Sequence, residues 1–96
     1  MPQFPGGDTG FATYISKNLK YPDEARKQRI QGSVYIFFII DTKGNVVNAE
    51  VFRALHPLLD KAALDVIMAS PKWIPGENNG VSVIVKKIQP IKFQLK

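Results

Sequence analysis

The sequence predicts an α+β domain in which a three-stranded antiparallel sheet carries helices on one face. Three observations support this: a strongly apolar run from Ser33 to Ile40, a short turn into a second strand, and a proline-bounded helix before a third strand. The expected order is α-α-β-β-α-β. Ninety-six residues make one domain, with no room for a second core.

The N-terminal part is expected to form a lead-in and a first helix. Met1 to Gly7 holds two prolines and two glycines, which is typical of an extended segment. We therefore divide the chain into a lead-in over residues 1–10 and a domain over residues 11–96. Asp8 can cap a helix whose apolar residues recur near helical spacing, at Phe11, Tyr14, Ile15 and Leu19.

A second short helix is expected after Tyr21-Pro22. A residue before proline is pushed out of the α region, and proline itself suits the first position of a helix. Asp23 and Glu24 are favourable in that first turn. Gly32 is expected at the left-handed end of this helix, after a buried Ile30.

Ser33 to Ile40 gives the strongest strand signal, and apolar residues on both faces make it the central strand. Asp41 to Asn45 predicts a hairpin turn, with Gly44 available for positive φ. Val46 to Arg53 returns as the second strand. Its alternation breaks by one residue, which predicts a bulge near Val47-Asn48.

His56-Pro57 opens a third helix that is expected to run to about Ser70, before Pro71. Trp73, beside Pro75-Gly76, is then expected to anchor the core. A polar loop is expected from Glu77 to Gly80. Val81 to Leu95 predicts a long third strand interrupted at Pro90. A right-handed crossover places this strand beside the central one, giving the sheet order 2-1-3 with strand three as an edge.

Composition and motifs exclude several classes of function. The net charge of +5 comes from scattered residues, 13 basic and 8 acidic, whereas a duplex-DNA binder more often carries a concentrated stripe. Without cysteine and with the single His56, no metal site is expected. No catalytic triad or phosphate loop is suggested, so we expect neither an enzyme nor a cofactor.

The N-terminus has no basic n-region and no apolar h-region, so it is not a signal peptide. No run of 18 apolar residues is present either. If the protein works outside the cytoplasm, we expect this chain to be part of a longer one that supplied the export signal.

The third strand carries the functional hypothesis. Proline cannot donate to a ladder, so Pro90 supports an edge position independently. On one interpretation, Lys86, Lys87 and Lys92 protect an ordinary edge against aggregation. On the other, the edge accepts an extended peptide as an added strand, held by main-chain hydrogen bonds. The residues alone leave both open.

Ordered motifs along the chain resemble those of the TonB C-terminal domain, from about Phe11 to Leu95. They are Tyr21-Pro22-x-x-Ala25, Ile30-x-Gly32-x-Val34, Phe38-x-Ile40-Asp41, Gly44-x-Val46, Leu59-Asp60-x-x-Ala63-Leu64, Trp73-x-Pro75-Gly76, Gly80-x-x-Val83 and Pro90-Ile91-x-Phe93. The lead-in resembles the variant found in Bacteroidota-type TonB proteins. No single motif is specific, but the ordered set is.

The resemblance implies a periplasmic energy-transducing domain in a parent protein anchored in the inner membrane. Such domains bind the TonB box, a short segment of an outer-membrane transporter, and pass on force from the inner-membrane energising complex for uptake of siderophores or other scarce nutrients. It implies contacts along the last strand and the Tyr-Pro segment. The residues are Val81, Ser82, Val83, Ile84, Val85, Lys86, Lys87 and Ile88, and Asn18, Leu19, Lys20, Tyr21 and Pro22.

An apolar patch is expected on the uncovered face of the sheet, formed by Tyr35, Phe37, Ile39 and Phe52. It predicts an interface with a second copy, with a folded-back lead-in around Phe4, or with another part of the parent protein. A rival function is single-stranded nucleic-acid binding through these aromatics, although the RNP1 pattern is absent. Another is service as the C-terminal module of a membrane sensor or peptidase.

Overall fold

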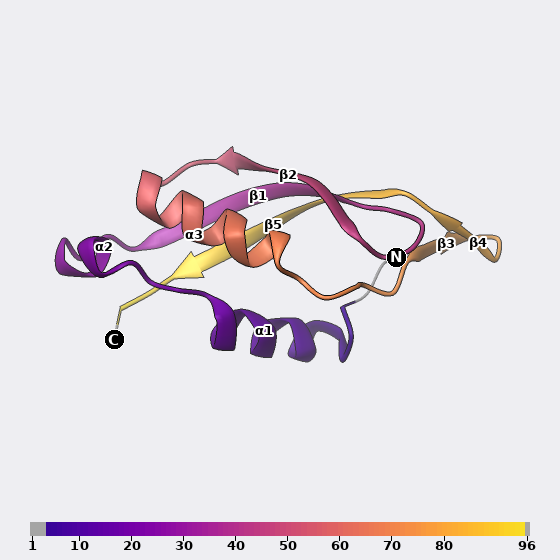
Figure 1. Ribbon diagram of the computed structural model, residues 1–96, viewed down its shortest axis with the longest axis horizontal. Helices are drawn as coiled ribbons and strands as arrows, with labels where there is room; N and C mark the ends of the chain where they lie inside the picture. The colour runs from indigo at the N-terminus through magenta and orange to yellow at the C-terminus, as the bar shows by residue number, and fades with distance from the viewer. Residues whose placement is uncertain (1–3, 96) are drawn as a thin grey trace.

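The computed structural model describes residues 4–95, so the expectations for Met1 to Gln3 and for Lys96 lie outside it. The molecule is elongated, 49 × 23 × 17 Å, with a hairpin projecting at one end (Figure 1). Its elements are α1 (Gly7–Asn18), α2 (Asp23–Lys27), β1 (Gly32–Ile40), β2 (Val46–Arg53), α3 (Pro57–Met68), β3 (Gly76–Asn78), β4 (Val81–Val83) and β5 (Val85–Phe93).

The main sheet confirms the predicted topology. Its strand order is β2-β1-β5, and both pairings are antiparallel, so the last long strand is an edge. In Figure 1, α3 crosses in front of the strands and α1 runs alongside β5. This is the predicted α+β architecture with β1 in the centre.

The two ladders on β1 differ in regularity. Its pairing with β5 runs without a shift from Gly32 opposite Phe93 to Ile40 opposite Val85. Its pairing with β2 has two register shifts. One falls between Phe37 and Ile39, opposite Asn48, whose φ of 52° is left-handed, and this confirms the predicted bulge.

The core lies between β1 and the helices. Alternate β1 side chains are fully buried, as expected when one face of a strand meets the core: Val34, Ile36, Phe38 and Ile40. They meet one face of α3, formed by Leu59, Ala63, Val66 and Ile67. Within residues 4–95, no helix has the length and apolar character needed to cross a bilayer.

The N-terminus is more structured than its composition suggested. Helix α1 already begins at Gly7, and its N-cap is Gly6 in a left-handed conformation (φ 84°), not Asp8. Gly10 lies so close to the preceding turn that a Cβ there would come within 2.1 Å of the Pro5 carbonyl oxygen. Phe4 is buried in the core, so part of the expected lead-in belongs to the fold.

Trp73 ties the crossover segment to the β1–β2 turn, confirming its expected role as a core anchor. Its backbone N–H donates to the Gly44 carbonyl at 2.8 Å, and its side chain is 6% exposed. Gly44 has φ 89°, and a Cβ there would come within 1.9 Å of the Trp73 carbonyl oxygen. Glycine is therefore required at this position for both its conformation and its close approach.

Three local predictions are wrong. The strand from Val81 is broken at Ile84, whereas Pro90 lies inside the continuous β5. The polar loop is a β3–β4 hairpin around Asn79-Gly80, both with positive φ, a combination that suits a tight hairpin turn. Helix α2 is followed by a left-handed Arg29 (φ 55°), while Gly32 (φ 143°) already begins β1 and Ile30 is only half-buried.

Candidate functional site

The outer edge of β5 is the candidate site, and Pro90 reveals which backbone groups it presents. Pro90 has no N–H, yet it sits opposite Tyr35 in an uninterrupted ladder. In an antiparallel pair, successive residues direct their N–H and C=O groups alternately toward and away from the partner strand. Pro90 therefore occupies an outward-directed position, where no ladder bond to β1 is lost.

Every second residue of β5, counted in either direction from Pro90, has the same backbone orientation as Pro90. The N–H groups of Lys86, Ile88 and Lys92 consequently point away from β1, and so do the carbonyls of these residues and of Pro90. The Gln89 side-chain amide donates to the Pro90 carbonyl at 3.2 Å, which agrees with that carbonyl facing outward. Along the described chain, β5 has one strand neighbour, β1.

A groove of ≈ 420 Å³ follows the second half of this edge, between β5 and α1. Its lining combines an apolar helix face with the strand edge: Phe11, Ala12, Ile15, Ser16, Leu19, Tyr21, Gln89, Pro90, Ile91, Lys92, Phe93 and Gln94. Sequence reasoning missed the contribution of α1 and of residues 89–94. Helical periodicity showed that α1 has an apolar face, but not which strand that face would meet.

Two residues of the Tyr-Pro segment, Leu19 and Tyr21, line this groove. Asn18 ends α1, and Leu19 to Pro22 link it to α2. Tyr21 stacks edge-on against Phe93 at a centroid distance of 5.4 Å, and its hydroxyl donates to the Ile30 carbonyl. Tyr21 thus has structural contacts and also lines the groove.

The structure divides the predicted edge residues into two groups. Val81, Ser82 and Val83 form β4, which pairs with β3 in the projecting hairpin, and Ile84 is the exposed break after it. Val85 to Ile88 form the first half of β5. The Tyr-Pro segment adjoins the second half, residues 89–94, and not residues 81–88. The predicted set is therefore displaced toward the hairpin relative to the groove.

The predicted apolar patch lies on the face of the sheet opposite the buried row of β1. Cross-strand partners share a face, and the register gives these rows: Tyr35 with Arg53 and Pro90, Phe37 with Glu50 and Ile88, and Ile39 with Val47 and Lys86. Phe52 is exposed at the register shift beside Arg53. We call Tyr35, Phe37, Ile39 and Ile88 the open face.

Phe4 does not cover the open face, so the version of the interface prediction with a lead-in folded back around Phe4 is wrong. The ring of Phe4 lies 5.2 Å from those of Phe11 and Trp73, centroid to centroid. Trp73 in turn lies 5.8 Å from Phe38, whose side chain is on the helix-covered face. Phe4 is 6% exposed in this aromatic cluster.

The ionisable residues around the turns have structural roles. His56 caps α3, because its Nδ1 accepts from the Leu58 N–H at 3.2 Å. The Asp60 carboxylate accepts from the Leu55 N–H at 2.8 Å. Hydrogen bonds from the Asn45 and Lys43 N–H groups, with the former the largest cause, lower the pKa of Asp41. Residues 4–95 contain no group of three or more potential metal-binding side chains.

Comparisons with known proteins agree with this geometry. The sequence model of a family described as the Gram-negative bacterial TonB protein C-terminal matches residues 17–95. An NMR solution structure of the Helicobacter pylori TonB C-terminal domain, residues 194–285, is 28% identical with a TM-score of 0.70, and the match covers 92% of each chain. A longer form, residues 179–285, is 30% identical with a TM-score of 0.63, covering 88% of this chain and 77% of that one.

A search of curated proteins finds no match. The family match covers residues 17–95, and the structural match covers most of the chain. The chain therefore belongs to the TonB C-terminal family, whose members are periplasmic, non-catalytic interaction domains of membrane-anchored TonB that act in energy transduction to outer-membrane transporters.

Proposed function

We propose that this domain binds the TonB box of an outer-membrane transporter as an added strand on the outer edge of β5. The observation that carries the proposal is the regular β1–β5 ladder, which leaves the outward groups of Lys86, Ile88 and Lys92 aligned along one edge. An aligned row of unpaired N–H and C=O groups is what an extended peptide requires. Family membership supports a transporter as the partner.

The groove beside β5 supports a defined path for the guest. A strand added along β5 would run from the exposed part near Lys86 into the groove beside Pro90. There, alternate guest side chains would meet Ile15 and Leu19 of the α1 wall, while the others would lie on the open-face side. Pro90 offers a carbonyl but no N–H, so the guest forms one hydrogen bond fewer there.

An added strand also suits the transmission of force. A pull along the strand is shared over several main-chain hydrogen bonds, each worth about 1 kcal/mol net. Such binding is reversible at rest and resists a brief load. The parent protein would be anchored in the inner membrane and couple this periplasmic domain to the energising complex there.

The decisive test places a proline at an outward position. Ile88→Pro removes an N–H that points away from β1, so the sheet should form while binding of a fluorescent TonB-box peptide weakens by at least about tenfold, because a hydrogen bond is lost and the ring crowds the guest. Ile88→Ala is the matched control, since it removes the same side chain but keeps the N–H. Fluorescence anisotropy gives the affinities.

Lys87→Pro is the reciprocal control. The backbone N–H of Lys87 points toward β1. Lys87→Pro therefore removes a hydrogen bond between β1 and β5 and should lower the free energy of unfolding by about 1–3 kcal/mol. Urea unfolding followed by circular dichroism measures it. Normal peptide binding by a folded Ile88→Pro variant would overturn strand addition at this edge.

Of the alternatives, the family match favours a transporter over single-stranded nucleic acid. The aromatics on the open face remain the feature that a nucleic-acid binder would use. A salt-dependent oligonucleotide titration therefore belongs beside the peptide experiment. Tight oligonucleotide binding together with no peptide binding would reverse this preference.

A further inference from the structure

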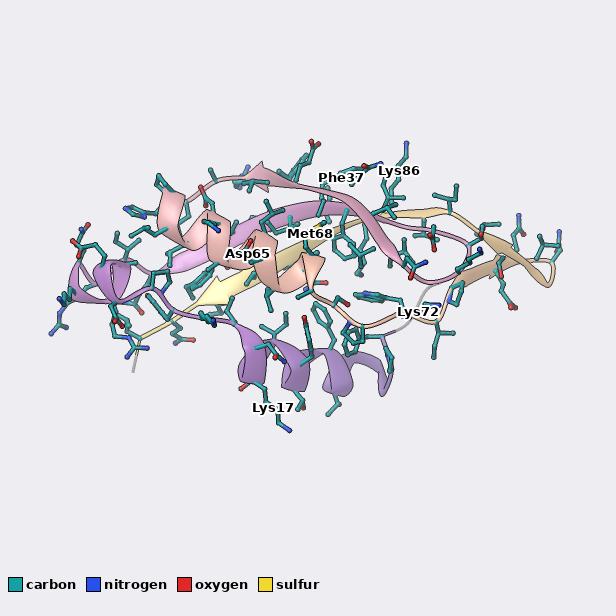
Figure 2. All side chains as sticks on the ribbon, viewed as in Figure 1. Lys17, Phe37, Asp65, Met68, Lys72 and Lys86 are labelled. Carbon is teal, nitrogen blue, oxygen red and sulfur yellow. The ribbon has the colours of Figure 1, made fainter. Side chains whose placement is uncertain are left out.

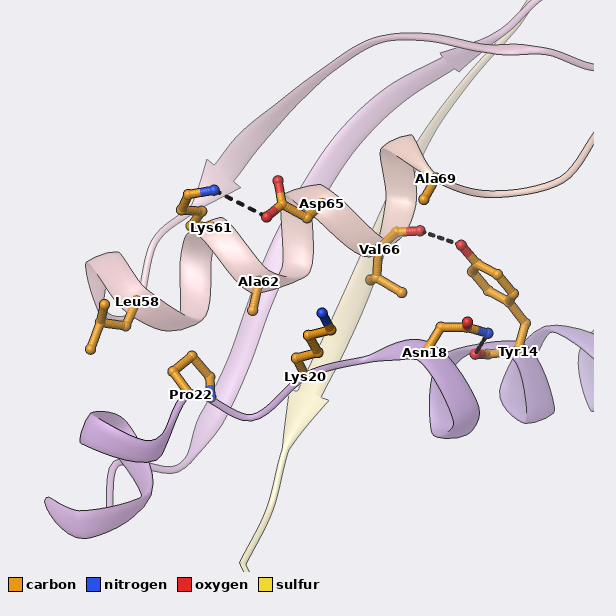
Figure 3. A pocket seen from close by; sticks show the side chains of 10 residues that line it. All are labelled: Tyr14, Asn18, Lys20, Pro22, Leu58, Lys61, Ala62, Asp65, Val66 and Ala69. Atoms are coloured by element: carbon orange, nitrogen blue, oxygen red, sulfur yellow. Dashed lines mark hydrogen bonds and ion pairs between the residues drawn. The ribbon is translucent and has the colours of Figure 1, made fainter.

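A second groove, of ≈ 530 Å³, lies on the other side of the Leu19–Pro22 link, between it and α3 (Figure 3). Its volume is within the range of small-molecule sites. Most of the exposed lining surface is apolar, and half of the lining residues carry a polar or charged group: Tyr14, Asn18, Lys20, Pro22, Leu58, Lys61, Ala62, Asp65, Val66 and Ala69. We call it the α3 groove.

The apolar floor of the α3 groove is a single stripe of α3. Leu58, Ala62, Val66 and Ala69 recur at helical spacing along this stripe. Leu58 is 36% exposed, so part of the stripe has no protein partner. An apolar ligand of moderate length would cover surface that water now contacts.

Tyr14 closes one end of the groove. Its hydroxyl donates to the Val66 carbonyl at 2.8 Å and so joins α1 to α3. Burial raises the pKa of Tyr14, which keeps the phenol neutral and able to donate. The wall opposite α3 is therefore held at a fixed distance at this end.

The α3 groove contains two lysines and one acidic residue, Lys20, Lys61 and Asp65. Lys61 pairs with Asp65 at 3.2 Å on the rim, so these two charges offset each other. Figure 3 shows the Lys20 side chain directed into the space between the link and α3. Among the described residues no acid forms an ion pair with Lys20, which leaves one cation beside an apolar floor.

We propose that the α3 groove binds a small anionic amphiphile, with its apolar body on the α3 stripe and its carboxylate at the Lys20 ammonium. A single alkyl or aryl carboxylate matches this combination of one cation and one apolar surface. The site is separate from the β5 edge. It shares a wall with the β5 groove, because Lys20 and Pro22 line the one and Leu19 and Tyr21 the other.

The test titrates the domain with octanoate and, separately, with 1-octanol, using ¹H–¹⁵N NMR spectra. Octanoate should bind saturably, shift the amides of Leu58, Ala62 and Val66, and bind at least about threefold more tightly than octanol, the scale of one exposed ion pair. Lys20→Gln should abolish that preference. Lys17→Gln is the matched control, because Lys17 points away from both grooves (Figure 2).

Ala62→Phe should fill the floor and weaken both ligands. Equal affinities for octanoate and octanol in the unaltered domain would overturn the proposal, and so would shifts confined to the open face or an octanoate preference that survives Lys20→Gln. None of these readouts involves the peptide, so failure here is distinguishable from failure of strand addition. If Ala62→Phe does not fold, Lys20→Gln still decides the question.

Discussion

The two edge strands of the sheet, β2 and β5, differ in the regularity of the backbone edge that each presents for pairing with a further strand. β2 carries two register shifts and a left-handed Asn48, so its backbone groups do not form one regular outer row. β5 pairs with β1 over nine consecutive residues without a shift. Bulges are a known means of twisting an edge away from further pairing. One edge is thus protected and the other remains a regular template.

If β5 binds a peptide as proposed, this difference would make the backbone as important for specificity as the side chains. The lysines of β5 do not interrupt its ladder, so they protect it less than the irregularities protect β2. Pro90 removes one donor but keeps the carbonyl available. The proposed guest peptide would therefore pair with β5, and the groove between β5 and α1 would limit which peptides fit there.

The largest expected effect concerns self-association. If β5 is kept for a guest, a homodimer should form through the open face instead, and Phe37→Asp should then weaken it by more than tenfold, because a charge would be buried against an apolar partner. Sedimentation velocity over a range of concentrations measures this. Concentration-independent monomers would remove the dimer. Loss of dimers in Ile88→Pro but not in Ile88→Ala or Phe37→Asp would place the contact at the edge.

A medium effect is expected at the β2 bulge. Asn48→Val places a β-branched residue in a left-handed conformation and should lower the free energy of unfolding by about 1–2 kcal/mol. Asn48→Gly is the control and should leave stability nearly unchanged. Chemical denaturation compares the two. If valine is tolerated as well as glycine, then the bulge does not depend on this residue and the protection of β2 has another cause.

The smallest effect concerns the turn that begins β2. Because the folded-state pKa of Asp41 is lowered, its contribution to stability is present above the unfolded pKa of about 3.9 and is lost as pH falls through the folded value. Asp41→Asn should therefore flatten the decline in stability below about pH 4. NMR titration of the carboxyl and unfolding at pH 7 and pH 3 test this. An unshifted Asp41 pKa would contradict it.

Local signals predicted much of the fold. The apolar run of β1, the bounds of β2 and its bulge, and Pro57 at the start of α3 all follow from short-range sterics and periodicity. Asn79-Gly80 is an equally local hairpin signal, because both residues suit the positive φ values of a tight turn. Pro90 correctly indicated an edge but not its continuity, because proline interrupts a ladder only when its missing N–H would have pointed inward.

The candidate site could be predicted only in part. That the last strand is an edge followed from the crossover rule, and the Tyr-Pro segment followed from the family resemblance. The Tyr-Pro segment adjoins the second half of β5 because of the way α1 packs. This packing brings residues 11–21 next to residues 89–94, which are far away in the sequence. Sequence periodicity identifies an apolar face, but it does not identify the partner of that face.

By itself, then, the sequence determined the types of the three helices and the three long strands, the order of the main sheet and the position of the last strand at its edge. These features depend on neighbouring residues and on chain connectivity. The tertiary structure alone decided the register that turns Lys86, Ile88 and Lys92 outward, the inclusion of Phe4 in the core, and the two grooves on either side of Leu19–Pro22. Those features arise where segments distant in sequence meet, and their packing is a property of the whole chain.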